Sequence, residues 1–249
     1  MSPARAITVL ATALLVVAGL GYLASQTVLA APAGLVASDQ QYLAAPSPAA
    51  RSSQEPAPGQ PVGTQRVDPG WVTRTAAKAG IPAPAVRAYA NAQLAEPSGC
   101  EVGWTTLAGI GWVESQHGTI GGRTLGEDGH SSTPVLGPAL DGKGQVAAIP
   151  ATPETTSWHG DPRWDHAVGP LQFIPSTWET WGADGDGDGV ADPNDIDDAA
   201  YTAARYLCAD GHDLKTGSGW ADAIFSYNHA QSYVDSVYAA AEAYADRTR

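Results

Sequence analysis

The sequence predicts a mainly α-helical domain that follows an export segment and a linker. Apolar residues recur at helical spacing in several segments, and glycine or proline bounds most of these segments. All 8 tryptophans lie between Trp71 and Trp220, so the folded core is expected beyond the first 70 residues or so. An Asp-rich stretch joins two of the predicted helices.

Residues 1–30 are predicted to direct export. Arg5 supplies a short basic region, an apolar run follows from residue 7 to about residue 24, and Val28 and Ala30 have the spacing that a signal peptidase accepts. The run is also almost long enough to span a bilayer of about 30 Å. We therefore expect the protein in the cell envelope or outside the cell. Two alternatives stay open: a cleaved signal peptide, or an uncleaved helix that anchors the chain to the plasma membrane.

Residues 31–69 are predicted to form a disordered linker. The segment is rich in Ala, Pro, Ser, Gln and Gly, and its prolines recur without a period. Such a composition cannot bury enough apolar surface to fold. We therefore assign residues 70–249 to one folded domain.

The chain is strongly acidic, with 13 Lys and Arg residues against 26 Asp and Glu residues and a formal net charge of -13. An acidic surface repels phosphate backbones, so we expect no nucleic-acid partner. We expect a monomer that contacts a membrane only through the N-terminal segment, if that segment is not cleaved.

The chain has 2 cysteines, Cys100 and Cys208. In an exported protein this count predicts one disulfide, and the alternative is two buried free thiols. A bridge that closes a loop of about 100 residues stabilises the fold by about 4 to 5 kcal/mol in the chain-entropy estimate.

Helix start and stop signals predict helices over residues 71–79, 82–94 (or from 84), 103–117, 175–181, 193–209, 219–230 and 232–247. Gly80 and Gly118 are the predicted ends of the first and third helices. A Gly/Pro/Asp-rich stretch over 121–169 is predicted to be irregular, with only short strands such as 146–149. Because so long an irregular stretch is unusual in a compact domain, we expect it to bind something.

Glu114 is the strongest candidate for an acid–base residue. It continues an apolar stripe on the third helix, formed by Trp104, Leu107, Ile110 and Gly111. Burial and the partial negative charge of the nearby helix C-terminus both raise a carboxyl pKa, as a general acid requires. The alternative is an outward-facing Glu114, or one paired with an arginine. Gly109 and Gly111 weaken the helix, which predicts a close approach of another backbone or of a ligand.

Four segments in this order resemble the membrane-bound lytic murein transglycosylase B family: GWVESQHG, AVGPLQFIPSTWETWG, the Asp-rich stretch and AIFSYNHAQSY. That family carries an SLT-type, lysozyme-like domain, and the resemblance covers residues 70–244. It implies cleavage of the β-1,4 bond between N-acetylmuramic acid and N-acetylglucosamine in peptidoglycan strands, with formation of 1,6-anhydro-muramic ends. It assigns the single acid and base to Glu114 and places Ser115 in the companion position, where it is expected to bind substrate.

The resemblance also implies substrate-binding residues. Gln172 is expected to line the groove, where its amide could bond sugar hydroxyls, although it could instead be a buried amide that bonds to backbone. Tyr227 is expected to orient Glu114 or the sugar, and Tyr233 is the further aromatic of the motif among the substrate-binding residues. The alternative for both tyrosines is packing between helices. Asn228 is expected to hold an N-acetyl group or to help stabilise charge in the transition state.

A second carboxylate keeps a hydrolase alternative open, because most glycosidases use two. Asp161 and Asp165 are the best candidates, and the alternative for both is turn structure. A third alternative is a calcium-stabilised wall-binding module without turnover.

The stretch DGDGDGVADPND matches the template of an EF-hand calcium loop. The predicted ligands of a structural Ca²⁺ are Asp184, Asp186, Asp188, the carbonyl of Val190, Asp192 and Asp195. Asp192 is further expected to cap the next helix, with Pro193 at its first position. The metal and the disulfide would then hold together the helix that carries Glu114 and the helix that contains Cys208.

Overall fold

The structure, a computed structural model, describes residues 47–50, 66–96, 100–143, 147–209 and 211–249. The predicted export segment and most of the predicted linker lie outside these residues. None of the described helices has the length and apolar character that crossing a membrane requires.

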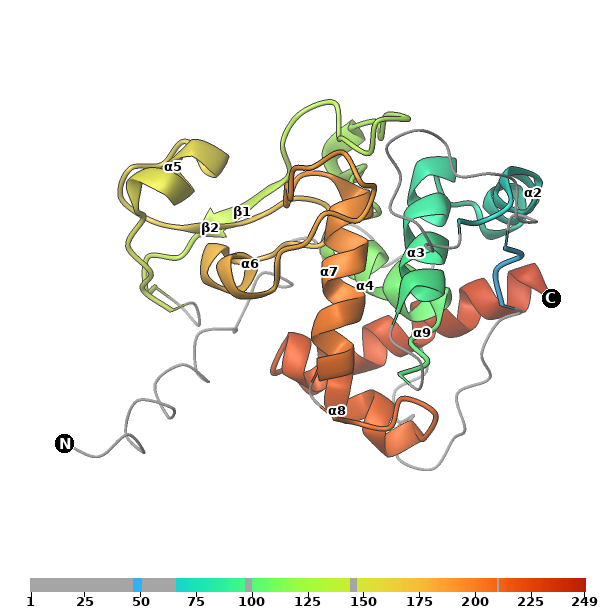
Figure 1. Cartoon of the computed structure of the whole chain (residues 1–249). Helices are drawn as coiled ribbons and strands as arrows, with labels where there is room; N and C mark the ends of the chain where they lie inside the picture. Colours follow the sequence, from blue (N-terminus) through green and yellow to red (C-terminus); the bar gives the residue numbers. More distant parts are fainter. Residues whose placement is uncertain (1–46, 51–65, 97–99, 144–146, 210) are drawn as a thin grey trace.

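Helices dominate the described domain, which confirms the mainly α-helical prediction (Figure 1). Every predicted helix is present, with small differences at the ends. The helices are α2 (Pro69–Ala79), α3 (Ala83–Ala95), α4 (Trp104–Ser115), α5 (Pro153–His159), α6 (Pro175–Trp181), α7 (Ile196–Ala209), α8 (Gly217–Tyr227) and α9 (Gln231–Thr248).

The start of the domain lies earlier than the predicted boundary at residue 70. The Asp68 side chain caps α2 by accepting a hydrogen bond of 2.7 Å from the Trp71 amide, and Val67 is buried. Val67 also pairs with Ala50 in an isolated antiparallel bridge. Arg66 donates hydrogen bonds to two loop carbonyls, those of Gly185 and Asp186. The end of the predicted linker is therefore part of the fold.

The stretch predicted to be irregular contains more structure than expected. Strands β1 (Leu136–Ala139) and β2 (His166–Val168) form an antiparallel pair, and α5 lies between them in sequence. The predicted strand at 146–149 is not found: residue 146 lies outside the described part, and Ala148 makes only an isolated bridge. The capping box of Thr152 and Thr155 fixes the start of α5. In Figure 1 β1, β2, α5 and α6 form a lobe beside the helical body.

Helix α4 lies in the core, where it packs on α9 while α3 packs on α7. A Cβ on Gly109 would lie 2.7 Å from the Val237 carbonyl oxygen of α9, and a Cβ on Gly111 would overlap the Tyr89 hydroxyl of α3. These contacts confirm the predicted close approach at both glycines, and they require that neither residue has a side chain.

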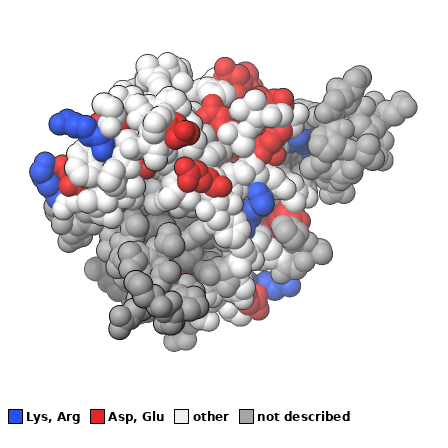
Figure 2. Space-filling view, turned by 60° about the vertical axis from the view of Figure 1, so that its left-hand side comes forward, with Lys and Arg blue, Asp and Glu red and all other residues white. Residues whose placement is uncertain are grey.

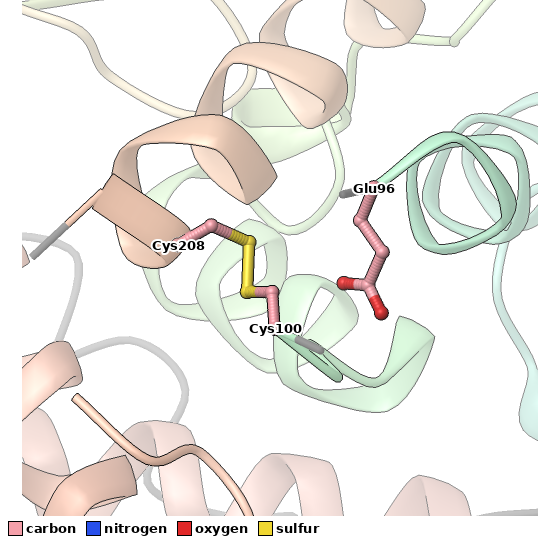
Figure 3. A group of neighbouring side chains, drawn as sticks. All are labelled: Glu96, Cys100 and Cys208. Atoms are coloured by element: carbon pink, nitrogen blue, oxygen red, sulfur yellow. A yellow bond between two sulfur atoms is a disulfide. The ribbon is translucent and has the colours of Figure 1, made fainter. Parts of the chain in front are cut away.

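The predicted disulfide is present. Cys100 precedes α4, Cys208 lies near the end of α7, and their Cα atoms are 5.4 Å apart. Figure 3 shows Glu96, at the end of α3, beside the bridge. The Glu96 carboxylate accepts a hydrogen bond of 2.8 Å from the Val102 amide, and burial raises its pKa to about 7. The bridge and Glu96 together fix the segment from which α4 begins.

Candidate active site

Glu114 lies in the last turn of α4 and is only partly exposed to solvent. The Tyr233 hydroxyl of α9 donates a hydrogen bond of 2.6 Å to its Oε1. Burial raises the pKa of Glu114 to about 8, and the Tyr233 hydrogen bond opposes part of that rise. The predicted rise in pKa is therefore confirmed. Within the described residues no arginine or lysine forms an ion pair with Glu114.

Tyr227 and Tyr233 lie side by side next to this carboxyl group. Their rings are stacked, with centroids 6.4 Å apart and an interplanar angle of 4°. Both side chains are buried, and the Tyr227 hydroxyl donates to the Leu171 carbonyl at 2.8 Å. Burial and the charge of Glu114 raise the pKa of each tyrosine well above its ordinary value. Tyr233 therefore orients Glu114 directly, whereas Tyr227 supports Tyr233 through its ring.

Ser115 does not line the site, in contrast to the substrate-binding role that the resemblance implied. Its side chain is 1% exposed. The hydroxyl donates to the Pro170 carbonyl and accepts from the Gly118 amide. Ser115 therefore ties the end of α4 to the segment before Gln172, and it cannot contact a ligand in this arrangement.

Gln172 is also buried, with 8% of its surface exposed, and it adopts a left-handed backbone at φ 52°. Its amide nitrogen donates to the carbonyls of Gly169 at 2.8 Å and Val135 at 3.3 Å. These bonds match the alternative prediction for Gln172, a buried amide that bonds to the backbone. Gln172 still borders a small pocket whose other lining residues are Phe173, Ile174, Thr177, Tyr206 and Tyr227.

Tyr206 is a residue that the sequence reasoning missed. Its hydroxyl donates to the Ser226 carbonyl at 3.0 Å, and its ring packs edge-on against Tyr227. In the sequence Tyr206 is one aromatic residue on a helix, and nothing distinguishes it from a core residue. Asn228 follows α8 directly and is 7% exposed. No described protein group bonds its side-chain amide, and that amide is not sealed from solvent.

The two candidate partner carboxylates serve local structure. Asp165 is 3% exposed, accepts a hydrogen bond of 2.6 Å from the Thr155 hydroxyl, and lies 3.2 Å from Nε2 of His159. Asp161 accepts from the Arg163 amide at 2.8 Å. Neither carboxylate contributes to the raised pKa of Glu114, for which burial is the main cause. This geometry favours turn structure for both aspartates.

The Asp-rich loop brings three carboxylates together. Oxygen atoms of Asp184, Asp186 and Asp188 lie within 4.8 Å of one another. The chain turns at Gly189, whose φ of 93° strongly favours glycine. Asp184 accepts hydrogen bonds from the amides of Gly187 and Gly189, which fold the loop around its carboxylate.

The end of the loop differs from the sequence template. Asp195 is buried, and its carboxylate accepts from the Asp197 amide at 2.7 Å, so that it caps α7. The cap is therefore not Asp192, and α7 begins at Ile196 rather than at Pro193. Asp198, in the first turn of the helix, accepts from the amides of Gly185 at 2.7 Å and Asp192 at 2.8 Å. Asp198 therefore contacts the loop through two of its backbone amides.

Acidic side chains are prominent on one face of the molecule. Figure 2 shows one face of the molecule, on which Asp and Glu side chains gather in the upper part. Among the described residues, Arg66 bonds loop carbonyls, Arg87 pairs with Asp197 at 2.7 Å, and Nε2 of His130 lies 3.5 Å from an Asp192 carboxylate oxygen.

Comparison with known proteins gave one family match. Residues 151–224 match the family described as Transglycosylase SLT domain. The matched segment includes Gln172 and the Asp-rich loop and ends before Tyr227; Glu114 lies outside it. No curated protein and no solved structure matched. The match supports the SLT-type transglycosylase family and the predicted lysozyme-like fold class, and it does not test the membrane-bound B subgroup.

Proposed function

We propose that this chain is an exported peptidoglycan lytic transglycosylase that uses Glu114 as its only acid and base. The observation that carries the proposal is the state of Glu114: a partly exposed carboxyl group, held by Tyr233, with a pKa of about 8. At neutral pH such a group holds a proton and can give it up when a substrate reaches it. The family match over residues 151–224 supports the same substrate class.

The proposed reaction uses the Glu114 carboxyl group twice, first as an acid and then as a base. Glu114 donates it to the oxygen that links N-acetylmuramic acid to N-acetylglucosamine, and the bond between C1 and that oxygen breaks. The resulting carboxylate then accepts the proton of the C6 hydroxyl of the muramic sugar while O6 bonds to C1. One C–O bond breaks, one forms, and no water is consumed. Tyr233 supports both halves, because its hydrogen bond stabilises the carboxylate that exists between them.

Asn228 is the proposed polar contact to the sugar. Its amide has both a donor and an acceptor, as an N-acetyl group requires, and no described protein group uses either. The side chains of Gln172 and Tyr227 donate hydrogen bonds to backbone carbonyls. We therefore assign these two residues to the shape of the pocket rather than to direct polar recognition.

We further propose that the Asp-rich loop holds a structural Ca²⁺. The donor set fits such an ion, because three clustered carboxylates and the Val190 carbonyl are oxygen ligands in a loop that turns at a glycine. Asp198 is a better candidate for the closing ligand than Asp195, since it already bonds two amides of the loop. Bound calcium would supply positive charge to offset the repulsion between carboxylates. The loop leads directly into α7, which the disulfide joins to the start of α4.

Release of soluble fragments from purified peptidoglycan tests the proposed activity. Wild type should release fragments, Glu114→Gln should not, and Asp161→Asn and Asp165→Asn should retain activity in proportion to their folded fraction. Loss of activity in well-folded Asp165→Asn would favour a hydrolase with two carboxylates. Equal inertness of wild type and Glu114→Gln would favour a wall-binding module without turnover.

A further inference from the structure

The turn that follows Glu114 has an unusual backbone. Gln116 and His117 are both in the left-handed region, at φ 53° and 61°. Residues with a Cβ rarely adopt this conformation, and two in succession persist only where the surroundings hold them. His117 is 2% exposed, so other residues surround its side chain. Because this position is not a glycine, contacts of the His117 side chain must stabilise the left-handed backbone.

Both ring nitrogens of His117 have a buried partner. Nδ1 lies 3.0 Å from the Tyr89 hydroxyl of α3, and Nε2 lies 2.9 Å from the Tyr244 hydroxyl of α9. Burial lowers the pKa of His117 to about 3, so the ring is neutral near pH 7. A neutral imidazole offers one donor and one acceptor, and the two hydroxyls can satisfy both.

The Tyr89 hydroxyl occupies the space that Gly111 leaves open, and the imidazole lies beside it. Nδ1 would lie 3.3 Å from a Cβ at that glycine, and the His117 amide donates to the Gly111 carbonyl at 2.8 Å. The chain therefore turns back toward α4 shortly after Glu114. The hydrogen bonds of His117 to Tyr89 and Tyr244 connect this turn to α3 and α9.

Helix α9 contacts both Glu114 and the turn that follows it. Tyr233 bonds the Glu114 carboxyl group, and Tyr244, on the same helix, bonds the ring that closes the turn after Glu114. We infer that His117 is a positioning residue for Glu114, acting through Tyr244 to fix the last turn of α4 against α9. This inference rests on the proposed function only for its kinetic consequences.

The physical consequence concerns the access of water to Glu114. If the turn loosens, Glu114 moves away from Tyr233 and toward solvent. Loss of the Tyr233 hydrogen bond alone would raise the pKa of Glu114, but burial is the larger cause of the present value. Better hydration therefore dominates, and the pKa should fall toward the ordinary value of 4.5. Among the described residues, the titratable groups that face Glu114 are Tyr233 from α9 and Tyr227 from the end of α8.

Two tyrosine variants test the inference as a matched pair. Tyr89→Phe and Tyr244→Phe each remove one buried hydroxyl from one nitrogen of the same ring, and neither residue bonds Glu114. Both should lower the melting temperature. Only Tyr244→Phe breaks the link to α9, so only this variant should lower the pKa of Glu114, by about one unit, and reduce kcat at least tenfold with little change in KM.

The pKa is measured by ¹³C NMR of protein labelled at the glutamate carboxyl carbons, with Glu114→Gln to assign the signal. This readout needs no turnover, so failure of the proposed function leaves it intact. His117→Gln, whose amide reaches the Nε2 position, should preserve the pKa better than His117→Asn, whose amide reaches the Nδ1 position. Equal pKa changes in both tyrosine variants, no change in either, or a change in Tyr89→Phe alone would overturn the inference.

Discussion

Replacing Glu114 by glutamine should stabilise the protein at high pH and leave it almost unchanged at low pH. The folded pKa of about 8 lies above the ordinary value of 4.5 that is expected after unfolding. Below pH 4.5 both states hold the proton, and the carboxyl group has no effect on stability. As the pH rises from 4.5 to 8 the unfolded chain loses the proton first, so the stability of wild type falls over this window.

The magnitude follows from the gap between the two pKa values. A gap of about 3.5 units at 1.36 kcal/mol per unit is worth up to about 5 kcal/mol above pH 8, and about 3 kcal/mol at pH 7. Partial exposure of the side chain makes the real figures smaller. Glutamine keeps an acceptor for the Tyr233 hydroxyl and carries no charge, so it removes the titration with little change in packing.

Urea unfolding of wild type and Glu114→Gln at pH 4, 7 and 9 measures the effect. The free energy of unfolding should be similar for the two proteins at pH 4, and the advantage of the variant should grow at pH 7 and again at pH 9. Asp235→Asn, which removes an exposed carboxylate of α9, is the control and should show no such growth. A difference between wild type and Glu114→Gln that is constant across pH would refute the reasoning.

Three further predictions concern the same structure. Tyr233→Phe removes the donor that favours the carboxylate, so the pKa of Glu114 should rise by about one to two units, and an unchanged alkaline limb of the pH–rate profile would contradict this. A calcium chelator should lower the melting temperature, with activity falling only as the fold loosens; lost activity at an unchanged melting temperature would count against a structural ion. Replacing Cys100 and Cys208 by serine should cost about 4 to 5 kcal/mol of stability in urea, and a loss below about 1 kcal/mol would show that the bridge does not constrain the unfolded chain.

Local sequence signals were sufficient to predict features that depend on a residue's own helix. Gly80 ends α2 in the left-handed conformation, and the apolar stripe correctly predicted a raised pKa for Glu114. The close approach at Gly109 was also predictable, because a glycine inside a helix has a cost that packing must offset.

The sequence could not reveal features that depend on distant partners. Helix α4 ends at Ser115 rather than at 117 because His117 is held in the left-handed region by tyrosines of α3 and α9. Asp195 caps α7, and the helix brings Asp198 to the loop. The calcium-loop template assigns ligands by their spacing in the sequence. It therefore cannot predict that Asp195, its last position, also caps α7.

The chemical nature of the cleaved ends tests the central claim most directly. Peptidoglycan is digested in H₂¹⁸O with wild type and with Glu114→Gln, and the fragments are weighed by mass spectrometry. A single acid and base that uses the C6 hydroxyl predicts muramic ends that are lighter by one water and free of ¹⁸O, and it predicts their absence with the variant. Reducing muramic ends that carry ¹⁸O from solvent would contradict the account, because water would then be the nucleophile.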